Sequence, residues 1–182
     1  MIVTPTELGG VLLVRPDVHA DQRGFFVEVW HATRYAAAGI PGPFVQDNHS
    51  RSSRHTLRGL HYQAGRPQGK LVRVAVGTVF DVAVDLRRSS PTFGRWVGTT
   101  LSGENHHQLW IPPGFAHGFY VLSEFADVMY KCTEVYNASG DRAVRWDDPD
   151  LAIAWPLAGA EHPILSGKDA TAPSLGETEA YP

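Results

Sequence analysis

The fold is decided by the stretch LVRVAVGTVFDVAVDL, residues 71–86. Apolar side chains alternate with other residues along much of this stretch, which is the pattern of β-strands that bury one face. Gly77 stands near the centre and predicts a turn. We therefore expect two strands that meet at Gly77, in a fold built from sheets.

The rest of the chain predicts more strands and little helix. The turn Pro112-Pro113-Gly114 separates QLWI (108–111) from FAHGFYVL. A short helix is expected near 31–38, ended by Gly39 and Pro41, and one helical turn in 147–156. The other strand candidates are residues 11–15, 24–30, 44–47, 57–63, 94–101 and 126–136. Closely spaced strands with almost no helix predict an all-β barrel or sandwich.

Length and composition exclude several classes of protein. A chain of 182 residues with 43% hydrophobic residues is expected to form one domain, 1–182, ending in a polar surface tail over about 170–182. A net charge of −3 gives no basic surplus for nucleic-acid binding. No apolar run approaches the roughly 20 residues that span a bilayer, and no secretory signal is recognisable. The single Cys132 excludes an internal disulfide. We expect a soluble, cytoplasmic protein.

The N-terminal strand candidates carry more apolar residues than one small core needs. Exposed strand edges invite pairing, and a second subunit is a natural cover for them. We therefore expect a homodimer.

Nine histidines suggest a metal site, but their spacing argues against one. Residues 112–117, PPGFAH, are similar to the second half of the cupin metal signature. The first half requires a His-x-His pair, and the matching region reads His61-Tyr62-Gln63. Three protein ligands are the usual minimum for a catalytic metal, so we expect no metal. Neither a G-x-S-x-G elbow nor a phosphate-binding glycine loop occurs, and Cys132 lies in an apolar strand.

Acid–base candidates remain within the strands. His61 shares a strand face with Leu57, Gly59 and Gln63, whereas Lys70 and Tyr130 share theirs with valines. Partial burial would shift the pKa values of the lysine and the tyrosine. Arg23 and Arg58 each precede a glycine, and arginine binds phosphate bidentately. Considered singly, these residues are more often solvated strand ends and surface ion pairs. The aromatic residues Phe25, Phe26, Phe119, Tyr120 and Tyr136 are most often core, but some could stack on a base or a sugar.

Longer stretches carry a family pattern, in order and over most of the chain. They include DQRGFFVEVW (21–30), FVQDNHSRSSRHTLRGLHYQ (44–63), LWIPPGFAHGFYVL (109–122), VMYKCTEVYN (128–137) and ILSGKDATAP (164–173). With these stretches the chain resembles dTDP-4-dehydrorhamnose 3,5-epimerases. The resemblance implies a cupin-like jelly-roll barrel that acts as a homodimer on a dTDP-sugar, without cofactor or metal. The product of these enzymes commonly enters rhamnose biosynthesis.

The resemblance also implies roles for individual residues. His61 matches the catalytic base, Asp169 the carboxylate paired with it, Lys70 the group that steadies the enolate oxygen, and Tyr130 the acid on the opposite face. The implied substrate-binding residues are Arg23 and Arg58 at the diphosphate, Glu28, Gln46, Asn48 and His117 elsewhere in the pocket, and Phe25 and Phe26 across the dimer.

The chemistry of these residue types agrees with that reaction. A 4-keto sugar has acidic C–H bonds at C3 and C5, and inversion needs a base on one face and an acid on the other. Histidine titrates near neutral pH and an aspartate can orient its ring. Lysine can stabilise the enolate charge.

Other functions stay open at this point. A relative that inverts only C3 or only C5 would use the same base and acid, and the nucleotide could differ from dTDP. A ketoisomerase on the same fold would move the carbonyl from C4 to C3. A non-catalytic sugar-nucleotide binding module is the alternative outside the enzymes. Product NMR separates the ketoisomerase from the epimerases, competition between dTDP and UDP or CDP tests the nucleotide, and binding without solvent exchange at the sugar carbons would indicate the binding module.

Overall fold

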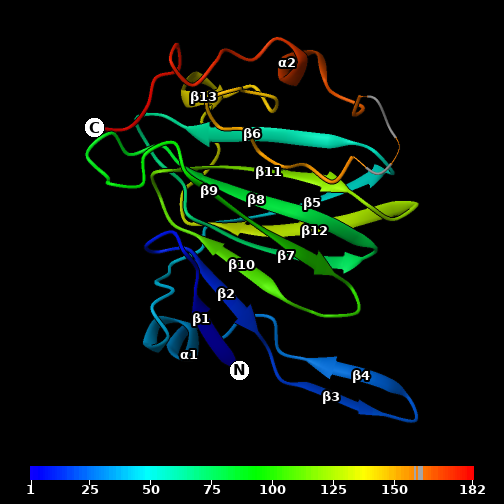
Figure 1. The fold of residues 1–182 in the computed structure, drawn as a ribbon. Helices are drawn as coiled ribbons and strands as arrows, with labels where there is room; N and C mark the ends of the chain where they lie inside the picture. Colours follow the sequence, from blue (N-terminus) through cyan, green and yellow to red (C-terminus); the bar gives the residue numbers. More distant parts are fainter. Residues whose placement is uncertain (158, 160–161) are drawn as a thin grey trace.

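Two β-sheets pack face to face in the computed structural model, which describes residues 1–157, 159 and 162–182 (Figure 1). One sheet has six strands, in the order β1 (Ile2–Pro5), β2 (Leu12–Arg15), β10 (Gln108–Ile111), β7 (Lys70–Val76), β12 (Phe125–Cys132) and β5 (Gln46–Ser53). The other has five, in the order β13 (Asp141–Ala143), β6 (Leu57–Gln63), β11 (Phe115–Val121), β8 (Thr78–Asp85) and β9 (Trp96–Ser102). This arrangement confirms the predicted all-β, cupin-like jelly-roll fold.

The stretch 71–86 forms β7 and β8, as predicted, and the chain changes sheet between them. Gly77 makes that turn with φ +80°, in the left-handed region. A Cβ atom there would lie 2.1 Å from the carbonyl oxygen of Phe125. The glycine is therefore required both by its backbone angle and by the close approach of the neighbouring chain.

The main core lies between the two sheets. Val72 and Val74 of β7 face Ala83 of β8 and Phe119 and Val121 of β11, and all are buried. Each of these valine and phenylalanine side chains, fully buried, contributes about 1.5–3 kcal/mol. Valines at every second position explain why these segments form strands rather than helices.

A second core covers the outer face of the five-stranded sheet. The C-terminal segment supplies Leu151, Trp155 and Leu175 to this core, which also holds Leu57 and Tyr120. The last residues, expected as a surface tail, thus lie against the barrel, with the hydroxyl of Tyr181 donating to the carbonyl of Gln63 at 2.8 Å. Residues 147–156 hold one turn closed by a helix-type hydrogen bond, in which the N–H of Ala152 donates to the carbonyl of Asp148 at 2.9 Å, although no helix is assigned there. The carboxylate of Asp148 there accepts backbone N–H groups of Asp150, Leu151 and Leu175.

The remaining elements are small. Helix α1 (Ala32–Ala37) lies close to its predicted position and buries Tyr35 on the outer face of the six-stranded sheet. Strands β3 (Val18–Asp21) and β4 (Gly24–Val27) form a hairpin that projects from the body of the molecule (Figure 1). The C-terminal segment contains a 3₁₀ turn, η1 (Ala138–Gly140), and the short helix α2 (Gly167–Ala170). None of the described helices is long and apolar enough to cross a membrane.

Candidate active site

A cavity of about 440 Å³ lies between the two sheets. Both sheets and the C-terminal segment line it, so the cavity is assembled from distant parts of the sequence. Its lining residues are Gln46, Asn48, Ser50, Arg58, His61, Tyr62, Gln63, Gln68, Lys70, His117, Phe119, Tyr130, Tyr136, Asp141 and Lys168. The structure therefore brings together His61, Lys70, Tyr130, Arg58, Gln46, Asn48 and His117 among the residues predicted from the sequence.

Strand register explains why these side chains meet. His61 of β6 is the register partner of His117 of β11, and Tyr130 of β12 is the partner of Asn48 of β5. Gly59 permits the close approach of β6 and β11, because a Cβ atom on it would lie 2.5 Å from the Cα atom of Gly118. Two strands on each wall thus present polar side chains into the same space.

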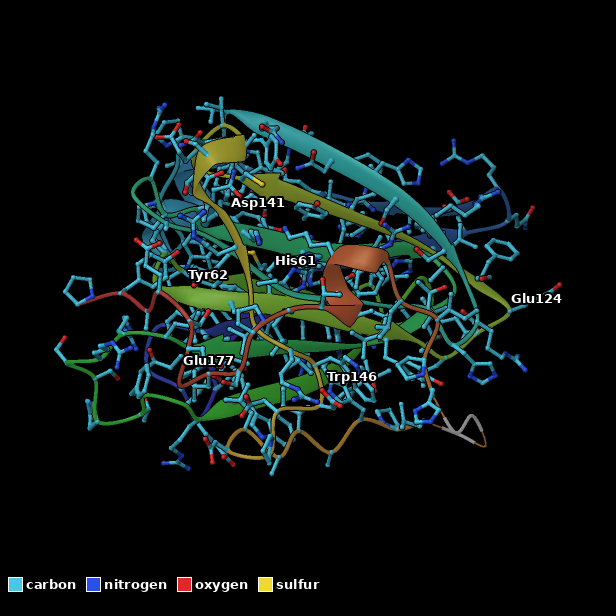
Figure 2. All side chains as sticks on the ribbon, turned by 90° about the horizontal axis from the view of Figure 1, so that it is seen from above. His61, Tyr62, Glu124, Asp141, Trp146 and Glu177 are labelled. Atoms are coloured by element: carbon cyan, nitrogen blue, oxygen red, sulfur yellow. The ribbon has the colours of Figure 1, made fainter. Side chains whose placement is uncertain are left out.

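His61 and Asp169 form a hydrogen-bonded pair. Nε2 of His61 lies 2.5 Å from Oδ1 of Asp169, whose side chain is only 3% exposed. Asp169 lies in α2, and the hydroxyl of Ser166 caps the helix by accepting the backbone N–H of Asp169 at 3.1 Å. In Figure 2 this helix lies beside His61.

The electrostatics of this pair determine which nitrogen can act as a base. Burial raises the pKa of Asp169, but hydrogen bonds from His61 and Ser166 outweigh it and leave the pKa below its ordinary value. The carboxylate is therefore ionised and can only accept, so Nε2 of His61 carries a proton. A neutral imidazole in that tautomer has a free electron pair on Nδ1.

Lys70 is a buried ammonium group at the start of β7. Its Nζ donates to the backbone carbonyl of His61 at 3.3 Å, and the residue is 8% exposed. Burial lowers the pKa of Lys70, while the charges of Cys132, Asp141 and Asp81 act in the opposite direction. The side chain is thus a buried hydrogen-bond donor held close to the histidine.

Tyr130 approaches the cavity from the other sheet. It lies on β12 of the six-stranded sheet, whereas His61 lies on β6 of the five-stranded sheet. Burial raises the pKa of its phenol, and the charge of Arg58 opposes that effect. A phenol with a raised pKa keeps its proton at neutral pH and can donate it. The cavity therefore has a possible base and a possible acid on opposite walls.

The remaining predicted residues of the cavity offer hydrogen bonds. Arg58 donates through Nε to the hydroxyl of Ser52 at 2.9 Å, which fixes its guanidinium plane. Nε2 of Gln46 donates to Oδ1 of Asn48 at 3.0 Å. His117 is buried, with Nε2 lying 2.8 Å from Oδ2 of Asp81.

Four predicted residues lie away from this cavity within one chain. Phe25 and Phe26 lie on the projecting hairpin and are 61% and 70% exposed. Arg23, at the hairpin turn, pairs with Asp21 at 2.6 Å, and Glu28 pairs with Arg34. The sequence prediction placed Phe25 and Phe26 across a dimer, and a single copy does not bring any of the four to the cavity.

Several lining residues were not predicted from the sequence. Ser50 had a usable signal, because it shares the strand face of Gln46 and Asn48. Tyr136 had a weak signal as an aromatic residue that could stack on a ligand, whereas Asp141 and Lys168 had none, since they come from separate segments and meet only in the folded chain. The hydroxyl of Tyr136 and Nζ of Lys168 both donate to Oδ2 of Asp141, at 3.3 Å and 2.5 Å.

Within the described ranges, no three side chains of histidine, cysteine, aspartate or glutamate are grouped so that they could hold a metal ion.

Comparison with known proteins gives a consistent result. The family model for dTDP-4-dehydrorhamnose 3,5-epimerase matches residues 5–177. A dTDP-4-dehydrorhamnose 3,5-epimerase from Pseudomonas aeruginosa is 52% identical over 183 residues, covering 100% of both chains. The crystal structure of the 3,5-epimerase from Legionella pneumophila, in complex with dTDP-4-keto-L-rhamnose, has a TM-score of 0.94 at 52% identity and covers 98% of this chain and 94% of that one. A 3′-monoepimerase from Streptomyces bikiniensis, in complex with dTDP-quinovose, has a TM-score of 0.86 at 34% identity and covers 94% and 87%.

Proposed function

The chain belongs to the dTDP-4-dehydrorhamnose 3,5-epimerase family and is an isomerase, and from this premise we propose how its own residues perform the reaction. It inverts C3 and C5 of dTDP-4-dehydro-6-deoxy-D-glucose to give dTDP-4-dehydro-L-rhamnose. Each inversion removes a proton next to the carbonyl and returns a proton to the other face of the ring. The keto group is already in the substrate, so no change of oxidation state is required.

His61 is the base in this proposal. The observation that carries it is the 2.5 Å hydrogen bond to the buried carboxylate of Asp169, because it leaves Nδ1 unprotonated. When Nδ1 takes a proton from carbon, the imidazolium is stabilised by the adjacent carboxylate. The same base can serve C3 and C5 in turn, since both carbons flank the C4 carbonyl.

Lys70 stabilises the enolate. Loss of the C–H proton places negative charge on the C4 oxygen, and a hydrogen-bond donor fixed beside that oxygen lowers the energy of that state. Burial of Lys70 and its position beside the His61 carbonyl support this role.

Tyr130 returns the proton. Its phenol lies on the wall opposite His61, which is the geometry that inversion needs. The raised pKa of its buried hydroxyl, caused mainly by burial, keeps the acid protonated until the enolate forms. A proton delivered from the His61 side would restore the starting configuration.

The nucleotide diphosphate is held by the polar part of the cavity. Arg58, fixed by Ser52, suits a phosphate group, and Gln46 and Asn48 supply further hydrogen bonds. The complex of the Legionella relative with a dTDP-sugar supports the same ligand class here.

A second copy of the chain completes the site. Two exposed phenylalanines on a projecting hairpin are an unfavourable surface for a monomer and suit an interface. In a homodimer the hairpin of one protomer reaches the cavity of its partner and brings Arg23, Phe25, Phe26 and Glu28 to the substrate.

The reaction is tested by proton NMR of dTDP-4-keto-6-deoxyglucose with the pure protein in D₂O. Deuterium at both C3 and C5, with the L-lyxo product trapped by a reductase, supports the double epimerase. Deuterium at one carbon only would make the protein a mono-epimerase. A carbonyl moved to C3 would indicate a ketoisomerase, and binding without exchange a non-catalytic module.

A further inference from the structure

A second histidine–carboxylate pair lies inside the barrel. His117 of β11 and Asp81 of β8 are 5% and 0% exposed, and Nε2 of His117 lies 2.8 Å from Oδ2 of Asp81. His117 lines the cavity, while Asp81 lies behind it. The pair resembles His61 and Asp169 in its chemistry, but the carboxylate comes from the core of the sheet instead of the C-terminal segment.

The surroundings of Asp81 do not satisfy its buried carboxylate. Its Oδ1 atom is buried and has no hydrogen-bond partner in the described part of the chain. Val79, Ala83 and Phe119 nearby belong to the apolar core. A buried carboxylate oxygen without a partner destabilises a fold, so packing alone gives no reason for an aspartate here.

We propose that Asp81 is a positioning residue that acts through His117, by fixing the nitrogen that this imidazole presents to the sugar. An ionised carboxylate only accepts hydrogen bonds, so Nε2 of His117 carries the proton. The neutral ring then offers the electron pair of Nδ1 to a ligand. The inference rests on the proposed epimerase function, because it assigns a task to His117 in that reaction.

An acceptor at this place has a specific use. The substrate carries hydroxyl groups at C2 and C3, and Nδ1 of His117 can accept from one of them while Lys70 donates to the C4 oxygen. His117 is the register partner of His61, and its ring centroid lies 6.3 Å from that of Tyr130. A sugar held by His117 is therefore positioned relative to both the base and the acid.

Asp81 also influences Lys70. Burial lowers the pKa of Lys70, and the negative charge of Asp81 raises it, together with Cys132 of β12 and Asp141 of β13. The positive charge of Lys168 of α2 lowers the pKa of Lys70, as burial does. Loss of the Asp81 charge therefore removes one of the groups that keep the Lys70 ammonium protonated.

The first test is the tautomer of His117 in the free protein. Nitrogen-15 NMR of histidine-labelled protein, with the His117 signals assigned through H117Q, reports which ring nitrogen carries the proton. We expect the Nε2-protonated tautomer in the natural protein and a mixture of tautomers in D81N, because an amide can also donate. A natural protein with the proton on Nδ1 would overturn the proposal. This measurement needs no substrate, so it is independent of the proposed function.

The second test is a comparison of D81N with D147N. Asp147 pairs with Arg145 at the surface, so D147N removes one carboxylate outside the cavity and is expected to keep full activity. For D81N we expect kcat to fall at least about tenfold with KM within about threefold, since the nucleotide still anchors the substrate. The alkaline limb of kcat should move to lower pH, and the melting temperature should not fall.

Two results would contradict the positioning role. One is a D81N protein with unchanged kcat. The other is a D81N protein whose loss of activity is matched by a lower melting temperature and an unaltered pH profile, because a structural residue behaves in that way. If the natural protein itself shows no epimerisation, the proposed function is wrong. The tautomer of His117 is measured without substrate, so that result tests the Asp81–His117 pair independently.

Discussion

The imidazole of His61 and the carboxylate of Asp169 are 108 residues apart in the sequence and 2.5 Å apart in the structure. A strand of the barrel fixes the histidine, and a capped helical turn of the C-terminal segment fixes its partner. The base thus depends on two independent parts of the chain. The hydrogen bond sets the tautomer of the ring, and the buried charge stabilises the imidazolium that forms during the reaction.

Asp169→Asn tests this dependence. An amide keeps the size of the side chain but can donate to Nε2 and put the proton on the wrong nitrogen. We expect kcat to fall about 10²–10⁴-fold, as in other histidine–aspartate pairs, with little change in KM. Deuterium exchange at C3 and C5 should fall together. Activity within threefold of the natural enzyme would show that Asp169 does not support the base.

Tyr130→Phe separates proton removal from proton return. The variant keeps His61 and Lys70, so exchange of the C–H protons with D₂O should persist, while inverted product falls about 10²–10⁴-fold. NMR follows exchange and product in one sample. Equal loss of exchange and product would argue against Tyr130 as the acid.

Tyr35→Phe is the matched control for that variant. Its hydroxyl donates to Oε1 of Gln108 in the buried layer under α1, outside the cavity. The variant leaves the buried Oε1 of Gln108 without this donor, so it should reduce the free energy of unfolding by about 1–3 kcal/mol and leave the exchange-to-product ratio unchanged.

The pH dependence of kcat should follow the loss of the Lys70 proton. Burial lowers the pKa of this ammonium group, so it loses its proton at a lower pH than an exposed lysine, and the cationic donor is present only below that pH. Burial raises the pKa of Tyr130, so its phenol loses its proton only at higher pH. We therefore expect kcat to decline on the alkaline side below pH 10.5, the ordinary lysine value.

Lys70→Met should remove this alkaline limb and most of the activity. The aliphatic chain fits the same space but cannot stabilise an enolate, and one lost donor of this kind costs about 10²–10³-fold in kcat. A Lys70→Met enzyme with the same alkaline limb as the natural enzyme would assign that limb to another group.

Complementation tests whether the hairpin acts on the partner subunit. His61→Asn removes the base but keeps the hairpin, and Arg23→Ala removes a hairpin guanidinium but keeps the base. If the hairpin acts in trans, one of the two sites of a mixed dimer is intact. Co-expressed variants should then recover about a quarter of the natural activity, since half of the dimers are mixed. Activity no greater than the average of the two separate variants would show that the hairpin does not complete the partner's site.

Alternation of apolar residues was sufficient to predict the central part of the fold. Strands β7 and β8 occupy the stretch around Gly77 because valines at every second position fill the core between the sheets. Strand β5 was predicted only in part, over 44–47, but runs over Gln46–Ser53. Both faces of β5 are polar, since Asn48 and Ser50 face the cavity while residues such as His49 face outward. A strand without an apolar face gives no alternation to read.

Part of the site could likewise be identified from the sequence, and part could not. His61, Lys70 and Tyr130 could be identified as strand residues that share a face with apolar neighbours, and their family roles came from the resemblance. The partner of His117 could not be identified, because Asp81 within FDVAVD looks like an ordinary polar position of a strand. Only the packing of β8 against β11 brings the two side chains together.

Deuterium exchange by His61→Asn tests the central claim most directly, because the assignment of a single base to both carbons determines the whole mechanism. The asparagine variant keeps Lys70, Tyr130 and the substrate-binding residues, and circular dichroism checks that it is folded. Incubated with dTDP-4-keto-6-deoxyglucose in D₂O, it should show no enzymatic exchange at C3 or C5, in contrast to Tyr130→Phe. Exchange at either carbon above a few per cent of the natural rate would contradict the account, since a different group would then be removing that proton.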